Sequence, residues 1–222
     1  MIKINKFDYR ILISGFFNAG KTTLIHKLDP NAISIEKRLS QDIIEKIKQE
    51  FGYDKEYTTT GFDRGIVCWV RPDMDINTNG YILSLDEYSA AIEFYKDWIV
   101  KFVELKGVPG QIHFKVVREM LSKDMDGAIF LVDGCDLANI SNALAIYEET
   151  RFYLTEERPI VIVANKCDHE KFQGVEYISM IFGQEVYQAS ALYNIGIKEA
   201  LIDVLKRVEL LKNNNQMLLY SS

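Results

Sequence analysis

Residues Gly15–Thr22 read Gly-Phe-Phe-Asn-Ala-Gly-Lys-Thr, a phosphate-loop pattern of two glycines five positions apart followed by lysine and a hydroxyl residue. The backbone N–H groups of such a loop form a cradle for an anion, Lys21 reaches the β- and γ-phosphates, and the Thr22 hydroxyl ligates Mg²⁺. The preceding residues 9–14 are typical of a buried strand and residues 22–28 of a helix, so the helix N-terminus faces the phosphates. The run therefore predicts a nucleoside triphosphate site formed by Gly15, Asn18, Ala19, Gly20, Lys21, Thr22 and Thr23.

A second motif indicates which base is bound. The apolar run 159–164, typical of a central parallel strand, is followed by Asn165-Lys166-Cys167-Asp168. The Asp168 carboxylate can accept hydrogen bonds from N1–H and the 2-amino group of guanine, a donor pair that adenine lacks. Asn165 can brace the loop, and the Lys166 stem can lie along the base with its head in solvent. Alone, this tetrapeptide is equally compatible with a polar exit from a strand.

Another loop supports the guanine interpretation. A short strand at 185–187 precedes Ser190, Ala191 and Leu192, and the backbone N–H of Ala191 is positioned to meet guanine O6. We therefore add these three residues to the predicted nucleotide site.

Composition indicates one globular domain. The chain has 222 residues, 48% of them hydrophobic, and a net charge of −6, which argues against a nucleic-acid partner. Three cysteines, Cys68, Cys135 and Cys167, lack metal or redox spacing and are expected to be reduced packing residues. No signal peptide, apolar stretch of about 18 residues or lipidation motif is found, so we expect a cytoplasmic protein that reaches a membrane only through a partner.

Apolar strand candidates alternate with helical stretches, which predicts an α/β fold with a mostly parallel sheet covered by helices on both faces. We expect a single domain over residues 1–212 and a tail at 213–222, because Asn213–Asn215 should end the last helix. Further strands are predicted at 66–70, 99–105 and 127–132, and helices at 142–154 and 194–211.

The order of these motifs resembles the Ras-like small GTPases over nearly the whole chain. Residues Thr58–Asp63 look like an Arf-type switch I, which implies that Thr59 ligates Mg²⁺ and touches the γ-phosphate. Residues Gly107–Gln111 look like switch II, in which Gly110 contacts the γ-phosphate through its N–H and Gln111 orients the attacking water. Carried over from the family, the catalytic residues are Lys21, Thr59 and Gln111, and the Mg²⁺ ligands are Thr22 and Thr59.

The sequence departs from the family pattern at two positions. Switch II normally opens with an aspartate that helps to hold Mg²⁺, and this chain has Gly107 there, in a form closer to MglA-like GTPases and the signal-recognition-particle-receptor β subunit than to Ras. Either Asp63 or another carboxylate replaces it, or Mg²⁺ is held more weakly by Thr22, Thr59 and the phosphates. Phe17 stands where Ras proteins have a small glycine, and its ring either crowds an arginine finger or packs outward.

The resemblance implies a small GTP-binding protein that uses GTP/GDP and Mg²⁺ as a molecular switch. Intrinsic hydrolysis is expected to be slow, on the order of 10⁻⁴ per second as in Ras, with an exchange factor, a GTPase-activating protein and an effector as partners and a homodimer as a further option. Arg64 and Arg71 are weak candidates for a built-in arginine finger. The competing interpretation is a GTP-binding scaffold that hardly hydrolyses, and an ATP-using enzyme is third.

The segment 71–97 separates two strands that small GTPases usually join by a tight hairpin, which predicts an insertion between the switches. Ser84-Leu85-Asp86-Glu87 has capping-box spacing, so a short helix to about Lys96 is expected. This insertion is either a decoration packed on the domain or a surface for an effector or a second copy.

Overall fold

A computed structural model describes residues 4–38, 57–73, 75, 78–111, 114–155 and 157–220. The elements in chain order are β1 (Tyr9–Gly15), α1 (Lys21–Leu28), β2 (Ile33–Arg38), β3 (Tyr57–Arg71), β4 (Tyr81–Ser84), α3 (Leu85–Ala90), β5 (Ile99–Gly107), α4 (Lys115–Ser122), β6 (Gly127–Asp133), η2 (Leu137–Asn139), α5 (Ile140–Leu154), β7 (Ile160–Asn165), α6 (Glu176–Phe182), β8 (Val186–Gln188) and α7 (Ile197–Tyr220).

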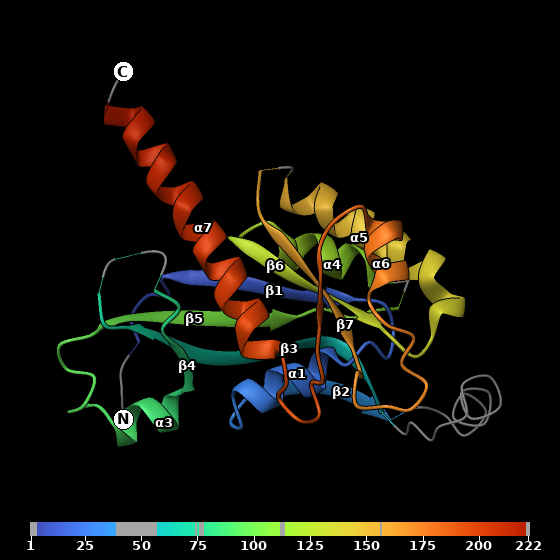
Figure 1. Ribbon diagram of the computed structural model, residues 1–222, viewed down its shortest axis with the longest axis horizontal. Helices are drawn as coiled ribbons and strands as arrows, with labels where there is room; N and C mark the ends of the chain where they lie inside the picture. Colours follow the sequence, from blue (N-terminus) through green and yellow to red (C-terminus); the bar gives the residue numbers. More distant parts are fainter. Residues whose placement is uncertain are drawn as a thin grey trace.

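The strands form one eight-stranded sheet in the order β2-β3-β5-β1-β6-β7-β8, with β4 also paired to β3 (Figure 1). The half from β5 to β8 is parallel, whereas β2, β3 and β4 pair antiparallel. Because parallel strands end at one edge, the loops after β1, β6, β7 and β8 lie close together, and ligands bind at this edge in open α/β sheets.

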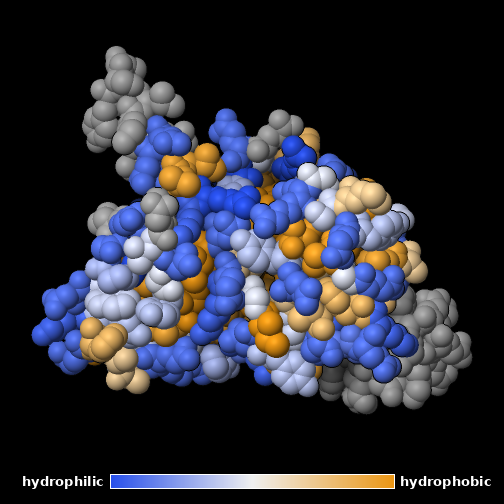
Figure 2. Space-filling view, viewed as in Figure 1, coloured by the Kyte–Doolittle hydropathy of each residue, from blue (hydrophilic) through white to orange (hydrophobic). Residues whose placement is uncertain are grey.

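Two hydrophobic cores lie on opposite faces of the sheet, because side chains alternate along each strand. In β1, Ile11 and Ile13 face the core formed with α1 and α7, whereas Leu12 faces the core formed with α5 and α6. The helices therefore make a layer on each side, and the predicted three-layer α/β class is confirmed. The view in Figure 2 is largely hydrophilic with scattered apolar patches, as expected where amphipathic helices turn their polar sides outward.

The last helix is longer than predicted. α7 continues through Asn213–Asn215 to Tyr220, and its C-terminal half extends past the sheet (Figure 1). Asparagine lowers helix propensity by only about 0.7 kcal/mol relative to alanine, and neither glycine nor proline interrupts the helix. Our expectation of a non-helical tail after Lys212 was therefore wrong for 213–220, and residues 221–222 lie outside the described residues.

The insertion between the switch-connecting strands is confirmed and consists of β4, α3 and a turn. The capping box forms: Ser84 Oγ accepts from the Glu87 N–H at 3.2 Å, and Glu87 Oε2 accepts from the Ser84 N–H at 2.7 Å. The helix ends at Ala90 rather than near Lys96. The chain turns instead over residues 91–97, where the rings of Tyr95 and Trp98 lie 5.1 Å apart.

Candidate functional site

The phosphate loop lies between β1 and α1, and two of its residues require glycine. Gly15 has φ 143°, and a Cβ there would stand 2.3 Å from the Leu131 carbonyl oxygen of β6. Gly20 has φ 97°, and a Cβ there would stand 2.2 Å from Asn165 Nδ2. The loop is therefore fixed by close approach to β6 and to the predicted guanine loop. Asn18 adopts a left-handed φ of 63°, which asparagine tolerates better than most residues.

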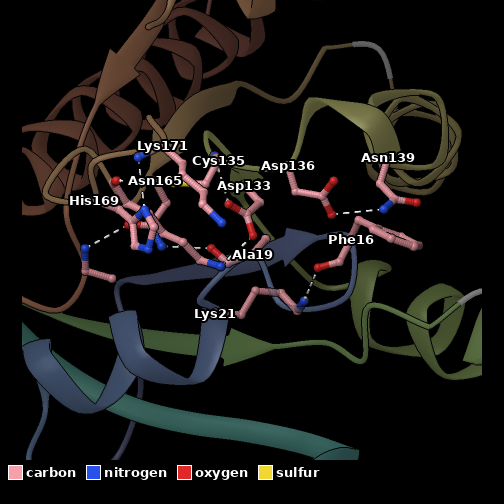
Figure 3. Close-up of polar contacts among 12 residues, drawn as sticks. Phe16, Ala19, Lys21, Asp133, Cys135, Asp136, Asn139, Asn165, His169 and Lys171 are labelled. Carbon is pink, nitrogen blue, oxygen red and sulfur yellow. Dashed lines mark hydrogen bonds and ion pairs between the residues drawn. The ribbon is translucent and has the colours of Figure 1, made fainter. Parts of the chain in front are cut away.

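Lys21, the first residue of α1, is almost buried at 8% exposure. Its Nζ donates to the carbonyl oxygens of Gly15 and Phe16, each at 2.9 Å, and Figure 3 shows the side chain reaching back along the loop. A Cβ on Gly110 would lie 2.6 Å from this ammonium group. The structure therefore brings together the phosphate loop and the glycine predicted to contact the γ-phosphate. The neighbouring Thr23 is exposed.

Asn165 joins three loops of the predicted site. Its Nδ2 donates to the Ala19 carbonyl oxygen at 2.8 Å, and its Oδ1 accepts from the Ala191 N–H at 2.8 Å. The side chain is 2% exposed, and its amide bonds to backbone groups of the phosphate loop and of the loop after β8. Asn165 thus has the predicted bracing position. The Ala191 N–H that we assigned to guanine O6 is, in this structure, donated to Asn165.

The remaining guanine-loop residues lie at the surface beside this brace. Asp168 is exposed, and its carboxylate accepts no hydrogen bond within the described part of the chain. Lys166 has φ 71°, and its Nζ forms an ion pair with Asp133 Oδ2 at the end of β6. We had expected the Lys166 ammonium group to lie in solvent, whereas it pairs with a carboxylate.

The loop after β8 is a closed turn. Ser190 is buried and pairs with Ile195 through two backbone hydrogen bonds, and its Oγ accepts from the Tyr193 N–H at 3.2 Å. Leu192, 52% exposed, projects from this turn. The turn holds Ala191 against Asn165 and leaves Leu192 accessible.

Asp63 lies beside Gly107, the position at which switch II lacks its usual aspartate. It is the register partner of Gly107 across β3 and β5, and a Cβ on Gly107 would stand 3.0 Å from Asp63 Oδ2. Asp63 Oδ2 accepts from Thr22 Oγ1 at 2.7 Å. The side chain is 1% exposed, and its Oδ1 is buried without a hydrogen-bond partner. A buried carboxylate oxygen without a partner, next to a threonine hydroxyl, has the chemistry of a Mg²⁺ or metal-bound water ligand.

Thr59 lies on the same strand as Asp63. Its backbone lies in β3 opposite Glu36 of β2, four residues before Asp63. At about 3.3 Å per residue, this places the two Cα atoms about 13 Å apart along the strand. The expected role of Thr59 as a Mg²⁺ ligand beside Thr22 stays a prediction. What differs from our expectation is the strand, because β3 begins at Tyr57, before the predicted start at Ile66, and pairs with β2, which the sequence analysis did not predict.

Switch II follows β5 and is anchored by a residue that the sequence analysis missed. Arg118 of α4 donates from Nη1 to the Gln111 carbonyl oxygen at 2.6 Å, and its Nη2 pairs with Glu149 of α5 at 2.6 Å. No local pattern signals this contact, because Arg118 and Glu149 are 31 residues apart. Gln111 is half-buried.

Neither arginine considered as a finger is available to the site. Arg64 Nε pairs with Glu104 at 2.7 Å on β5. Arg71, 1% exposed, pairs with Glu209 of α7 at 2.9 Å and is the last residue of β3, eight residues after Asp63. Each guanidinium group thus pairs with a carboxylate.

The cysteines are free thiols, and two have raised pKa values. Burial raises the pKa of Cys68 to about 12. For Cys135, burial and then the neighbouring Asp133 carboxylate raise the pKa to about 11. Both thiols stay protonated near neutral pH, which fits the packing role that we predicted.

Among the described residues, no three or more His, Cys, Asp or Glu side chains form a group suited to a metal ion. None of the helices seen there has the length and apolarity to span a bilayer.

A mostly parallel sheet with a phosphate-loop sequence after β1 and the Asn-Lys-Cys-Asp loop after β7 is the arrangement of a P-loop small G domain. Residues 83–210 match the family model described as the Ras family. The chain is 32% identical over 104 residues to Ras-related protein Rab-21 of mouse, rat and cattle, which covers 45% of this chain and 47% of each relative. The match thus spans about half the length of these relatives. The chain belongs to the Ras family.

Proposed function

We propose that this chain binds GTP and GDP with Mg²⁺ and acts as a GTPase switch with slow intrinsic hydrolysis. The observation that carries the proposal is the Asn165 brace, which joins the phosphate loop to the guanine loops through buried hydrogen bonds. A site built in this way holds the polyphosphate and the base at a fixed separation. Membership of the Ras family supports the same function.

The phosphates bind in the loop Gly15–Thr22, where they replace the Gly15 and Phe16 carbonyl oxygens as partners of the Lys21 ammonium group. The exposed Asp168 carboxylate accepts from guanine N1–H and the 2-amino group, and Leu192 covers the base. The Ala191 N–H meets guanine O6 only if it is shared with Asn165 or released from it. Selection of guanine over adenine therefore rests mainly on Asp168.

Thr22 and Asp63 hold the Mg²⁺ shell in this proposal. Asp63 takes over, from the neighbouring strand, the part of the aspartate that switch II lacks at Gly107. When bound, Mg²⁺ neutralises charge on the β- and γ-phosphates. Thr59 joins the shell only after β3 has separated from β2 near Glu36, so its contribution depends on a rearrangement of switch I.

Gln111 orients the attacking water, and Gly110 contacts the γ-phosphate through its N–H. No arginine of the described site is free to act as a finger, which supports slow turnover and activation by a partner. An exchange factor and an effector follow from the same switch. The likeness of switch II to the MglA-like GTPases, cytoplasmic location and a homodimer remain predictions.

The second candidate is a GTP-binding scaffold that hardly hydrolyses. The pairing of Thr59 with Glu36 in the β2–β3 ladder favours it, because the ladder would have to open before this predicted catalytic residue joined the Mg²⁺ shell. Phe17, which is half-buried in the phosphate loop, is compatible with either function.

Hydrolysis of GTP and ATP with Mg²⁺, measured for the natural chain, Gln111→Ala and Asp168→Asn, separates the candidates. The switch predicts slow GTP turnover that Gln111→Ala lowers and binding that Asp168→Asn weakens. Tight GTP binding without turnover supports the scaffold. ATP turnover that is insensitive to Asp168→Asn contradicts the guanine assignment.

A further inference from the structure

Arg118 is buried behind switch II although it carries a charge. The residue is 1% exposed, and its guanidinium group lies between the backbone of switch II and Glu149 of α5. Nη1 donates to the carbonyl oxygens of Gln111 at 2.6 Å and of Pro109 at 3.4 Å, while Nε and Nη2 donate to Glu149 Oε2 at 3.1 and 2.6 Å. The two carbonyl groups flank Gly110.

The contact with Pro109 bears directly on Gly110. The Pro109 carbonyl and the Gly110 N–H belong to one planar trans peptide unit, so they point in opposite directions. Arg118 therefore fixes the direction of the Gly110 N–H by holding the oxygen at the other end of that unit. Its contact with Gln111 holds the carbonyl oxygen of the residue after the glycine. Because glycine has no side chain, the Pro109–Gly110 peptide is free to rotate unless an outside group holds it.

The same glycine lies against the phosphate loop. A Cβ on Gly110 would come within 2.6 Å of Lys21 Nζ, 2.6 Å of the Phe16 carbonyl carbon and 2.7 Å of the Gly15 oxygen. The backbone that Arg118 holds from behind thus faces the predicted phosphate site on its other side. A positive charge on the carbonyl end of a peptide also polarises its N–H toward an anion.

We propose that Arg118, fixed by Glu149, is a positioning residue that aims the Gly110 amide at the γ-phosphate and thereby sets the preference for GTP over GDP. This inference rests on the proposed function. GDP lacks the γ-phosphate, so its affinity does not depend on this amide. The arrangement also links α4 and α5 to the nucleotide state, because the guanidinium group that holds the Pro109 carbonyl belongs to α4 and pairs with Glu149 of α5.

The test compares the affinities of GDP and of a non-hydrolysable GTP analogue, both with Mg²⁺, for the natural chain and for Arg118→Lys. Lysine keeps the charge but lacks the planar fork that reaches two carbonyls and a carboxylate together. We expect the GTP analogue to bind roughly tenfold more weakly, the effect of one lost hydrogen bond near a charge, with GDP affinity changed less than about twofold. Glu149→Gln, which keeps the shape and removes the anchoring charge, should shift the ratio in the same direction.

Arg207→Lys is the matched control, because Arg207 pairs with Asp203 on the exposed side of α7 and should leave both affinities unchanged. If Arg118→Lys fails to fold by circular dichroism, Glu149→Gln decides. An unchanged GTP:GDP ratio in the folded variant, or an equal loss for both nucleotides, overturns the role of Arg118 while leaving the proposed function intact. A natural chain that binds neither nucleotide overturns the proposed function itself.

Discussion

Replacing Asp63 by asparagine removes a buried charge while keeping the shape of the side chain. The Thr22 hydroxyl can still donate to the remaining oxygen of the amide, so the local packing at β3 is retained. The buried Oδ1, which has no partner in the described structure, becomes part of a neutral group. The variant therefore isolates the charge of Asp63 from its volume.

Two effects of opposite sign are expected. Loss of a carboxylate that orients a metal or its bound water lowers metal affinity by about 10- to 100-fold, which corresponds to about 1.4–2.7 kcal/mol. Without nucleotide and Mg²⁺, the same change relieves the desolvation of a 1% exposed carboxylate that has one hydrogen bond. We therefore expect the free energy of unfolding of the nucleotide-free chain to rise by about 1–2 kcal/mol.

The assay is urea denaturation in EDTA for stability, and titration of Mg²⁺ against the release of a fluorescent GDP analogue for metal affinity. Asp124→Asn is the matched control, because Asp124 is exposed in the turn after α4. Mg²⁺ dependence equal to that of the natural chain would refute the assignment of Asp63 to the metal shell. A less stable nucleotide-free chain would refute the statement that its charge is uncompensated.

Exchanging the two register partners provides a stricter test. Gly107→Asp alone should be poorly tolerated, because the new Cβ would stand 2.7 Å from Ile25 Cδ1 and 3.0 Å from Asp63 Oδ2. In the double variant Asp63→Gly, Gly107→Asp the second of these contacts is gone, and the carboxylate returns to the usual strand. We expect Mg²⁺ affinity to recover to within about tenfold of the natural value. If the double variant bound Mg²⁺ as weakly as Asp63→Asn does, the carboxylate could not serve the metal from β5 in place of β3.

Three further changes test the site and the fold. Asp168→Asn should weaken GTP binding by roughly 100-fold or more, since the proposed site loses a carboxylate that accepts two hydrogen bonds from guanine. Equal GTP affinities of the variant and the natural chain in a fluorescence titration would contradict this prediction. Asn165→Ala leaves the Ala19 carbonyl and the Ala191 N–H unpaired and should lower the free energy of unfolding in urea by about 2–4 kcal/mol, whereas a loss below about 0.5 kcal/mol would exclude a bracing role. Burial raises the pKa of Cys68 from near 9 to about 12, so the thiol loses its proton at lower pH in the unfolded chain than in the folded one. The free energy of unfolding should therefore fall by about 2 kcal/mol between pH 9 and 11. Cys68→Ala should flatten this pH dependence, and an unchanged dependence would assign it to another group.

The phosphate loop and the guanine loop could be identified from the sequence because each is contiguous. Glycines at positions 15 and 20, Lys21 and Thr22 lie within eight consecutive residues, and the geometry that they impose is local. The apolar runs before Gly15 and Asn165 likewise predicted the strands that present both loops. Nothing distant had to be known to place these groups at one edge of a parallel sheet.

Only the tertiary structure decided three features, which are the partner of Gly107, the strand that pairs with Thr59 and the Arg118–Glu149 contact. Asp63 faces Gly107 because β3 and β5 pair in one particular register, and a shift by one residue would turn its side chain to the other face. That register is set by the packing of whole strands against α1 and the rest of the sheet, not by the residues around position 63. The sequence by itself predicted which ligand the site would take, whereas long-range packing decided which carboxylate lies beside Thr22 and which arginine lies behind Gly110.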